Sequence, residues 1–60
     1  MNIIALTNLQ KEKILINLDY VINISPGIGC TWVVTTKEHY KIIETVDEVY
    51  ELIKNYKNDY

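Results

Sequence analysis

The sequence predicts an α+β domain in which a small antiparallel β-sheet of four to five strands is followed by one C-terminal α-helix. Three observations support this prediction. Short runs rich in β-branched and aromatic residues alternate with polar turns as far as Ile43. The connections between these runs are too short for the crossover that parallel strands need. After them comes one segment with apolar residues at helical spacing. We expect residues 1–60 to form a single domain.

The first two strands are predicted over Ile3–Thr7 and Lys13–Leu18, with a polar turn between them. Because side chains alternate along a strand, Ile4 and Leu6 share one face of the first strand. The turn-forming Asn17 and Asp19 interrupt the apolar run of the second strand. Alternation in that strand separates two sets, with Ile14, Ile16 and Leu18 on one face and Leu15 and Asn17 on the other.

Three further strands are predicted over Val21–Ile24, Cys30–Thr36 and Tyr40–Ile43. The segment Ser25–Gly29 contains the only proline and both glycines, which predicts a hairpin loop. A second turn is expected at Lys37–His39. In the fourth strand, alternation places Cys30, Trp32 and Val34 on one face and Thr31, Val33 and Thr35 on the other.

The helix is predicted to run from about Val46 to Lys57 and is the most strongly marked element. Thr45 is a favourable N-cap, and Glu48 three residues later completes a capping box. The tail after Lys57 is expected to fray. One stripe of the helix is predicted to face the sheet, formed by Val46, Val49, Tyr50, Ile53 and Tyr56.

Size and composition predict self-association. A chain of 60 residues buries only about 60% of the surface that its unfolded form exposes, yet 48% of these residues are apolar. The single cysteine, Cys30, cannot form an internal disulfide. One helix covers one face of a sheet, whereas the second and fourth predicted strands are apolar on both faces. We therefore expect a homo-oligomer, a dimer or higher, and expect Trp32 either to anchor the core or to lie at the subunit interface.

Charge and hydropathy exclude several classes of protein. The net charge is −2, with six lysines and no arginine, which argues against a nucleic-acid partner. No apolar run approaches 18 residues, so no transmembrane segment is predicted. The N-terminal Met1–Ile4 lacks the basic residues of a signal peptide, and an unpaired cysteine suits a reducing compartment. We expect a cytoplasmic protein.

No catalytic residue, metal site or cofactor is predicted. His39 lies in a polar turn with no nucleophile near it in the sequence, so we expect a solvated side chain. Cys30 has no adjacent base that would activate its thiol, so we expect a small buried apolar residue. The acidic residues Asp47, Glu48 and Glu51 have no histidine or cysteine at metal-ligand spacing, and they favour the positive end of the helix dipole.

Aromatic and hydroxyl side chains form the candidate binding site. Aromatic residues stack on planar ligands and dominate protein interfaces. Backbone N–H groups of the Ser25–Gly29 loop are candidates for binding an anion. The predicted binding residues, for a protein partner or for a small nucleotide-like ligand shared between subunits, are Trp32, Tyr40, Tyr20, Thr31, Thr35 and His39.

The order of these features resembles the FlbD family of small flagellar-operon proteins, also called SwrD in swarming bacteria. The matching residues are Ile4, Leu6 and Thr7, the turn residues Asn17 and Asp19, the run Val21–Ile24, and Glu44, Thr45, Glu48 and Val49 at the helix start. The resemblance covers nearly the whole chain. It implies a non-catalytic accessory role in flagellar motor output or swarming, in a bacterial cell. The alternative is a phage-encoded protein that sequesters a nucleotide-derived signal in the cytoplasm of its host.

Overall fold

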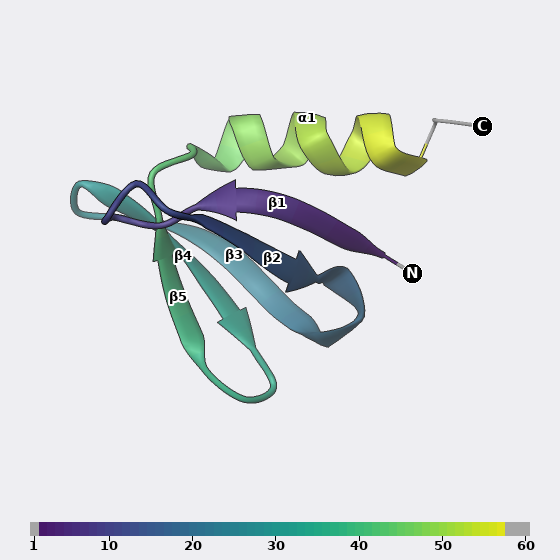
Figure 1. The fold of residues 1–60 in the computed structure, drawn as a ribbon, viewed down its shortest axis with the longest axis horizontal. Coiled ribbons are helices and arrows are strands. Elements are labelled where there is room, and N and C mark those ends of the chain that lie inside the picture. Colours follow the sequence, from purple (N-terminus) through teal and green to yellow (C-terminus); the bar gives the residue numbers. More distant parts are fainter. Residues whose placement is uncertain (1, 58–60) are drawn as a thin grey trace.

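Five antiparallel strands and one α-helix make up the part of the chain that the computed structural model describes, residues 2–57 (Figure 1). A one-turn 3₁₀ helix (Leu18–Tyr20) separates the second and third strands. The predicted α+β class and the antiparallel pairing are both confirmed. The elements in chain order are β1 (Ile3–Thr7), β2 (Lys13–Asn17), β3 (Val21–Gly27), β4 (Cys30–Thr35), β5 (His39–Ile42) and α1 (Val46–Lys57).

The strands form two sheets, so the prediction of one sheet is wrong. β1 pairs with β2, and β3, β4 and β5 form a separate sheet in that order. The 3₁₀ helix after β2 causes the break. The Asn17 side chain accepts a hydrogen bond from the Asp19 backbone N–H at 2.9 Å, which turns the chain there. As a result β3 enters a different sheet, and Leu18 belongs to the 3₁₀ helix instead of β2.

Several strand ends differ from the predicted ones, most clearly at β3. This strand continues through Pro26 to Gly27, and only Ile28 and Gly29 form the turn. Proline is compatible with β3 because β3 is an edge strand and needs no backbone donor on its free side. Elsewhere the differences are single residues, since β4 ends at Thr35, and β5 begins at His39 and ends at Ile42.

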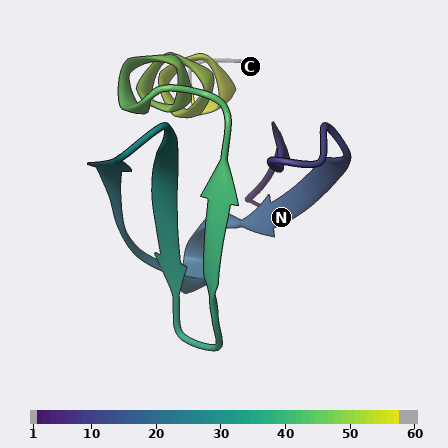
Figure 2. The ribbon, with the colours of Figure 1, turned by 90° about the vertical axis from the view of Figure 1, so that its left-hand side faces the viewer.

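The core lies between the two sheets and under the helix. Alternation along β1 and β2 is confirmed, because Ile4, Leu6 and Ile16 are buried and Leu15 is 70% exposed. The helix packs against β1 and β3 and covers one side of the molecule (Figures 1 and 2). The buried apolar side chains are Ile4, Leu6, Ile16, Val33, Ile42 and Val49.

The predicted helix bounds are confirmed, but its apolar stripe is narrower than expected. Val49 is buried and Ile53 packs against the core, whereas Tyr50 is 61% exposed. Tyr50 follows Val49 by about 100° around the helix axis, which turns its side chain toward the flank. The side chain of Tyr56 and the tail 58–60 lie outside the described residues.

The capping box is formed as predicted. The Glu48 backbone N–H donates to Thr45 Oγ1 at 3.1 Å, and the Thr45 N–H donates to Glu48 Oε1 at 2.8 Å. We expect Thr45→Ala to lower the free energy of unfolding by about 1 kcal/mol, because one N–H of the first turn loses its acceptor. Urea denaturation followed by circular dichroism measures this loss. Thr45→Ser is the control and should retain most of the stability, so equal losses in both variants would contradict the assigned cap.

A hydrogen bond to Glu44, which follows β5, links the two sheets. Its Oε1 accepts the Thr7 backbone N–H at 2.9 Å, and the Ile43 N–H donates to the Thr7 carbonyl at 2.9 Å. Burial alone raises the pKa of Glu44, but hydrogen bonds from Thr7 and the positive charge of Lys13 outweigh it, so the net pKa is lowered. The ionised carboxylate therefore stabilises the folded state.

We expect a pH-dependent stability from this lowered pKa. A carboxylate with a lowered folded-state pKa stabilises the protein above its unfolded pKa, about 4.3, and that contribution is lost as the pH falls through the folded-state pKa. Glu44→Gln should cost about 1 kcal/mol at pH 7, and the difference from the unaltered chain should shrink toward pH 3. Urea midpoints across this range test it. The control, Glu51→Gln on the exposed helix surface, should show no such convergence, and a pH-independent deficit in Glu44→Gln would contradict the assignment.

Candidate functional site

Residues of β2 and β5 together line two hollows between the two sheets. We call this region the seam. β2 pairs only with β1, and β5 pairs along its length only with β4. At its C-terminal end β5 meets β1 through the Asn8–Ile42 bridge, which closes that end of the seam. Figure 2 shows β5 at the edge of its sheet that lies toward the β1–β2 hairpin.

The alternation of backbone hydrogen bonds along each hairpin shows which backbone groups of β2 and β5 point away from their paired strands. In an antiparallel ladder, alternate residues direct their N–H and C=O groups to the paired strand. The Asn8 N–H bonds to the Glu12 carbonyl at 2.9 Å, which sets the phase of the first hairpin. The Thr35 N–H bonds to the Glu38 carbonyl at 3.0 Å, which sets the phase of the β4–β5 hairpin. The residues left with free backbone groups are Lys13, Leu15 and Asn17 on β2, and His39 and Lys41 on β5.

We expect this phase to be visible in amide hydrogen exchange. The N–H groups of Leu15 and Lys41 face the open seam, whereas those of Ile16 and Tyr40 point toward the paired strand. Leu15 and Lys41 should therefore exchange at least about tenfold faster than Ile16 and Tyr40, since an exposed amide exchanges without an opening reaction. NMR-detected exchange measures all four amides in one experiment. Equal protection of Leu15 and Ile16 would mean that the seam is already filled by another strand.

Two hollows lie along the seam, one on each side of Tyr40. The first has a volume of about 190 Å³ and the second a volume of about 410 Å³. The first is lined by Leu15, Ile16, Asn17, Tyr20, Thr35, Thr36, Lys37 and Tyr40. The second is lined by Asn8, Leu9, Gln10, Ile14, His39, Tyr40 and Lys41.

Tyr40 lies between the two hollows and packs against the core. A hydrogen bond to the Glu38 carboxylate raises the pKa of Tyr40, and burial and the negative charge of Glu38 raise it further. The phenol is therefore a neutral hydrogen-bond donor at physiological pH. Its ring and hydroxyl suit contact with a ligand or partner, and the raised pKa argues against a role as a base.

The predicted binding residues fall into three separate places. Tyr20, Tyr40 and Thr35 line the first hollow together, and His39 lines the second. Thr31 is buried, with 4% of its surface exposed, and it faces the core side of β4. The prediction that Thr31 belongs to an accessible aromatic surface is therefore wrong, because it shares its strand face with Val33 and not with Trp32.

Thr35 also differs from its predicted role, since its hydroxyl is already engaged. Thr35 Oγ1 donates to the Glu38 carbonyl at 2.7 Å and accepts from the backbone N–H groups of Lys37 and Glu38 at 3.3 and 3.1 Å. The side chain thus organises the β4–β5 turn. It positions Lys37 beside the first hollow.

Trp32 lies on the outer face of β4, so the prediction that it anchors the core is wrong. It is half-buried and does not belong to the core cluster. The Lys41 Nζ lies 5.0 Å from the ring centroid, a cation–π distance. The His39 ring meets it edge-on, with centroids 6.3 Å apart and planes at 87°. These neighbours place Trp32 on the outer face beside β5, away from Tyr20.

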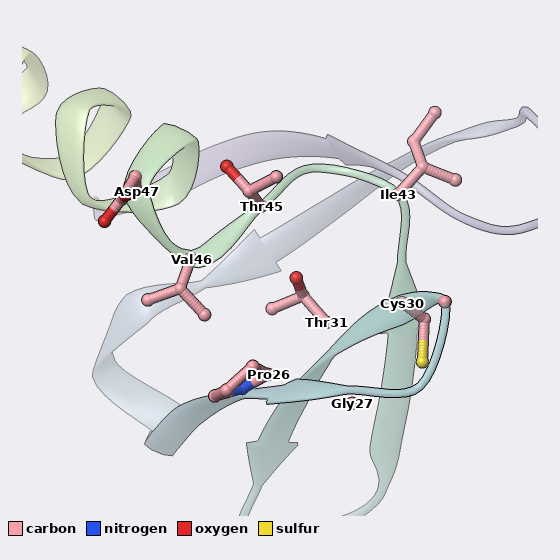
Figure 3. A pocket seen from close by; sticks show the side chains of 9 residues that line it. Pro26, Gly27, Cys30, Thr31, Ile43, Thr45, Val46 and Asp47 are labelled. Carbon is pink, nitrogen blue, oxygen red and sulfur yellow. The ribbon is translucent and has the colours of Figure 1, made fainter.

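A further hollow, of about 470 Å³, lies between the helix start and the β3–β4 hairpin (Figure 3). Cys30 and Thr31 form one wall, while Val46 and Asp47 approach from the helix. The predicted burial of Cys30 is only partly correct, since the residue is half-buried and its Sγ lies beside Gly27, on the outer face of β4 with Trp32. The predicted Ser25–Gly29 anion loop is wrong, because Ser25–Gly27 is paired as β-strand. The Asp47 carboxylate beside the helix start further disfavours an anion there.

Residues 2–57 contain no group of three or more histidine, cysteine or acidic side chains that could hold a metal ion. Within the same residues, no helix has the length and hydropathy needed to cross a membrane. Comparisons with protein-family models, curated proteins and solved structures gave no match.

The sequence prediction omitted several residues of the seam. Leu15, Asn17, Lys37 and Lys41 line the hollows, but none belongs to the predicted binding set. The available signal was the position of two lysines, since Lys37 precedes the predicted fifth strand and Lys41 lies within it. Only the folded structure shows that this strand and β2 are edge strands whose residues line the same hollows.

Proposed function

We propose that this protein is a non-catalytic binding module that self-associates and acts through contacts with a protein partner. The observation that carries the proposal is the amount of large apolar surface outside the core. Among the side chains that the structure describes, eight large apolar ones are more than 40% exposed, whereas the core holds six buried ones. Covering exposed apolar surface on association is favourable because it removes that surface from water. The exposed residues are Leu9, Leu15, Tyr20, Ile22, Ile28, Ile43, Tyr50 and Leu52.

The separation of the chemically reactive side chains supports a non-catalytic role. A nucleophile and its base must lie within hydrogen-bond distance of each other. The β4–β5 register pairs His39 with Val34, which is four residues along β4 from Cys30, a separation of roughly 13 Å at about 3.3 Å per residue. These two side chains therefore do not form a nucleophile–base pair in one site.

Sedimentation velocity at low micromolar concentration tests self-association. We expect a mass of at least twice the 7.0 kDa of the chain. A compact, stably folded monomer would overturn this part of the proposal, because the exposed apolar side chains would then be stable in water without a second copy. Hydrogen exchange on the same sample would show which of them are covered.

The resemblance to FlbD supports a more specific proposal, in which this binding module has an accessory role in the flagellum. The bacterial two-hybrid assay against stator and rotor proteins of the flagellar motor provides the test. We expect an interaction that is lost in a variant of the seam, Leu15→Glu, and retained in Lys54→Glu on the helix. If no motor protein interacts, the flagellar role is contradicted. The more general proposal of a self-associating binding module is tested separately, by the mass measurement.

A second candidate function is capture of a small nucleotide-like ligand. The favouring observation is that two predicted residues, Tyr20 and Tyr40, line the same hollow as Lys37. Aromatic rings stack on a base, and the ammonium group suits a phosphate. A volume of about 190 Å³ is below that of a typical complete ligand pocket, so it suits one base, with the remainder held by a second subunit.

A thermal-shift series with cyclic nucleotides and ADP-ribose tests ligand capture. Binding to the folded state alone raises the melting temperature, and the stabilisation grows with the logarithm of the ligand concentration above Kd. We expect a shift that disappears in Tyr20→Ala and persists in Tyr50→Ala, a matched exposed tyrosine on the helix. If none of these compounds shifts the melting temperature, the ligand function is rejected.

A further inference from the structure

We infer that the seam binds an extended acidic segment of the partner protein, which adds as a strand to the free edge of β2. This inference rests on the proposed binding function and names the class of partner. Three independent features of the seam support it. They are the free backbone groups of β2, the two hollows beside Tyr40, and the sign of the charges that surround them.

The first feature is the edge of β2. Its free backbone groups belong to Lys13, Leu15 and Asn17, the alternate residues whose N–H and C=O groups point away from β1. Leu15, in the middle, is 70% exposed. A regular edge with an exposed apolar residue and no bulge is an arrangement to which an added strand pairs. The one charged residue of β2, Lys13, is at its first position and leaves the edge around Leu15 uncharged. β5 offers a shorter edge, with only His39 and Lys41 free.

The second feature is the shape of the seam beside this edge. Two hollows open on either side of Tyr40, and Ile14 and Ile16 contribute apolar surface to them. Side chains two residues apart on a strand project to the same side. An added strand can therefore place alternate side chains in the two hollows, with Tyr40 between them. Its backbone would supply the affinity and the hollows the selectivity.

The third feature is charge. The cationic side chains beside the hollows are Lys37 in the first and Lys41 in the second, with His39 next to Lys41. Among the described residues, no carboxylate lines either hollow, and the carboxylate of Glu38 interacts with the Tyr40 hydroxyl. Charge complementarity therefore favours a partner segment with acidic residues.

A second copy of the chain is a less suitable occupant. The exposed acidic side chains of the helix, Asp47, Glu48 and Glu51, complement the lysines in sign. However, a helix has its backbone groups bonded within itself and cannot satisfy the free groups of β2. The β2 edge of a second copy could satisfy them, but β2 carries Lys13 and no acidic residue, so it does not complement the lysines. An extended segment satisfies both the charge and the backbone, which is why we assign the seam to a partner.

A phage-displayed library of random heptapeptides, selected against the intact protein, tests the inference. We expect enriched peptides to alternate apolar residues with at least two acidic ones. Lys37→Glu and Lys41→Glu should each weaken the binding of a synthesised, enriched peptide by about tenfold or more, because an attraction becomes a repulsion. The control, Lys54→Glu, makes the same charge change on the exposed helix and should leave the affinity unchanged.

NMR of the complex locates the strand. We expect the amides of Lys13, Leu15 and Asn17 to become protected from exchange when the peptide binds. Leu15→Pro removes one free N–H at an edge position that does not bond to β1, and it should abolish binding while circular dichroism shows a retained fold. If Leu15→Pro fails to fold, the lysine variants decide the question.

Three results would overturn the inference. They are the absence of enriched peptides, enrichment of basic peptides, and equal binding by the lysine variants and the control. A loss of oligomeric mass in Leu15→Glu or Lys37→Glu would also overturn it, because the occupant would then be a second copy. The proposed function fails separately, by a monomeric mass in sedimentation velocity of the unaltered protein.

Discussion

Leu6→Ala is expected to lower the free energy of unfolding by about 3–5 kcal/mol, enough to remove most of the stability of a domain of this size. The Leu6 side chain is fully buried, on the inner face of β1 opposite Ile14. Its loss leaves a cavity at the meeting point of the two sheets and the helix. Urea denaturation, followed by the fluorescence of Trp32, measures the effect.

Leu15→Ala is the matched control for this prediction. It removes the same atoms from a strand of the same sheet, but Leu15 is 70% exposed. The change in stability should stay within about 0.5 kcal/mol. Both variants must be compared at one protein concentration, since self-association adds to the apparent stability. A loss below about 1 kcal/mol for Leu6→Ala would show that the packing at this point is looser than the burial indicates.

The helix could be predicted from the sequence because its signals are local. Thr45 and Glu48 lie three residues apart, and both hydrogen bonds of the capping box form within that span. The faces of β1 and β2 could also be predicted, since alternation needs only neighbouring residues. Each of these features depends on interactions that are close in the sequence.

The division into two sheets could not be predicted in the same way. It depends on long-range contacts, such as the hydrogen bond between the Ile43 N–H and the Thr7 carbonyl and that between Glu44 and the Thr7 N–H. The extension of β3 through Pro26 has a similar cause. Proline ends most strands, and only the edge position of β3 makes it acceptable here.

The candidate site was partly predictable. Tyr20, Tyr40 and Thr35 were expected to act together, and they do line one hollow. Their chemistry identified them, but their spatial grouping required the seam. Trp32 was assigned to the same site because alternation alone does not show which of the two faces of β4 is covered by the rest of the fold. Tertiary packing covers the face of Val33 and leaves Trp32 on the other.

Gly27→Ala is expected to displace the Trp32 indole and to cost about 1–3 kcal/mol. A Cβ atom at Gly27 would lie 2.7 Å from both Cδ1 and Nε1 of Trp32 and 3.2 Å from Cys30 Sγ. Because the indole is rigid, the whole ring must move away from Gly27. Tryptophan fluorescence reports the movement as a shift of the emission maximum toward longer wavelength, and urea denaturation gives the loss of stability.

Gly29→Ala is the control that distinguishes the contact between Gly27 and Trp32 from the general effect of replacing a glycine. Gly29 has a φ of +71° and no atom within 4 Å of the added Cβ, so its cost of about 1 kcal/mol comes from backbone strain alone and should leave the emission of Trp32 unchanged. A double-mutant cycle with Trp32→Ala completes the test. Once the indole is removed, Gly27→Ala should become nearly neutral, which corresponds to a coupling of about 1–3 kcal/mol, the full cost of the single variant. An additive result would mean that Trp32 does not rest on Gly27, and the outer face of β4 would then be free to rearrange.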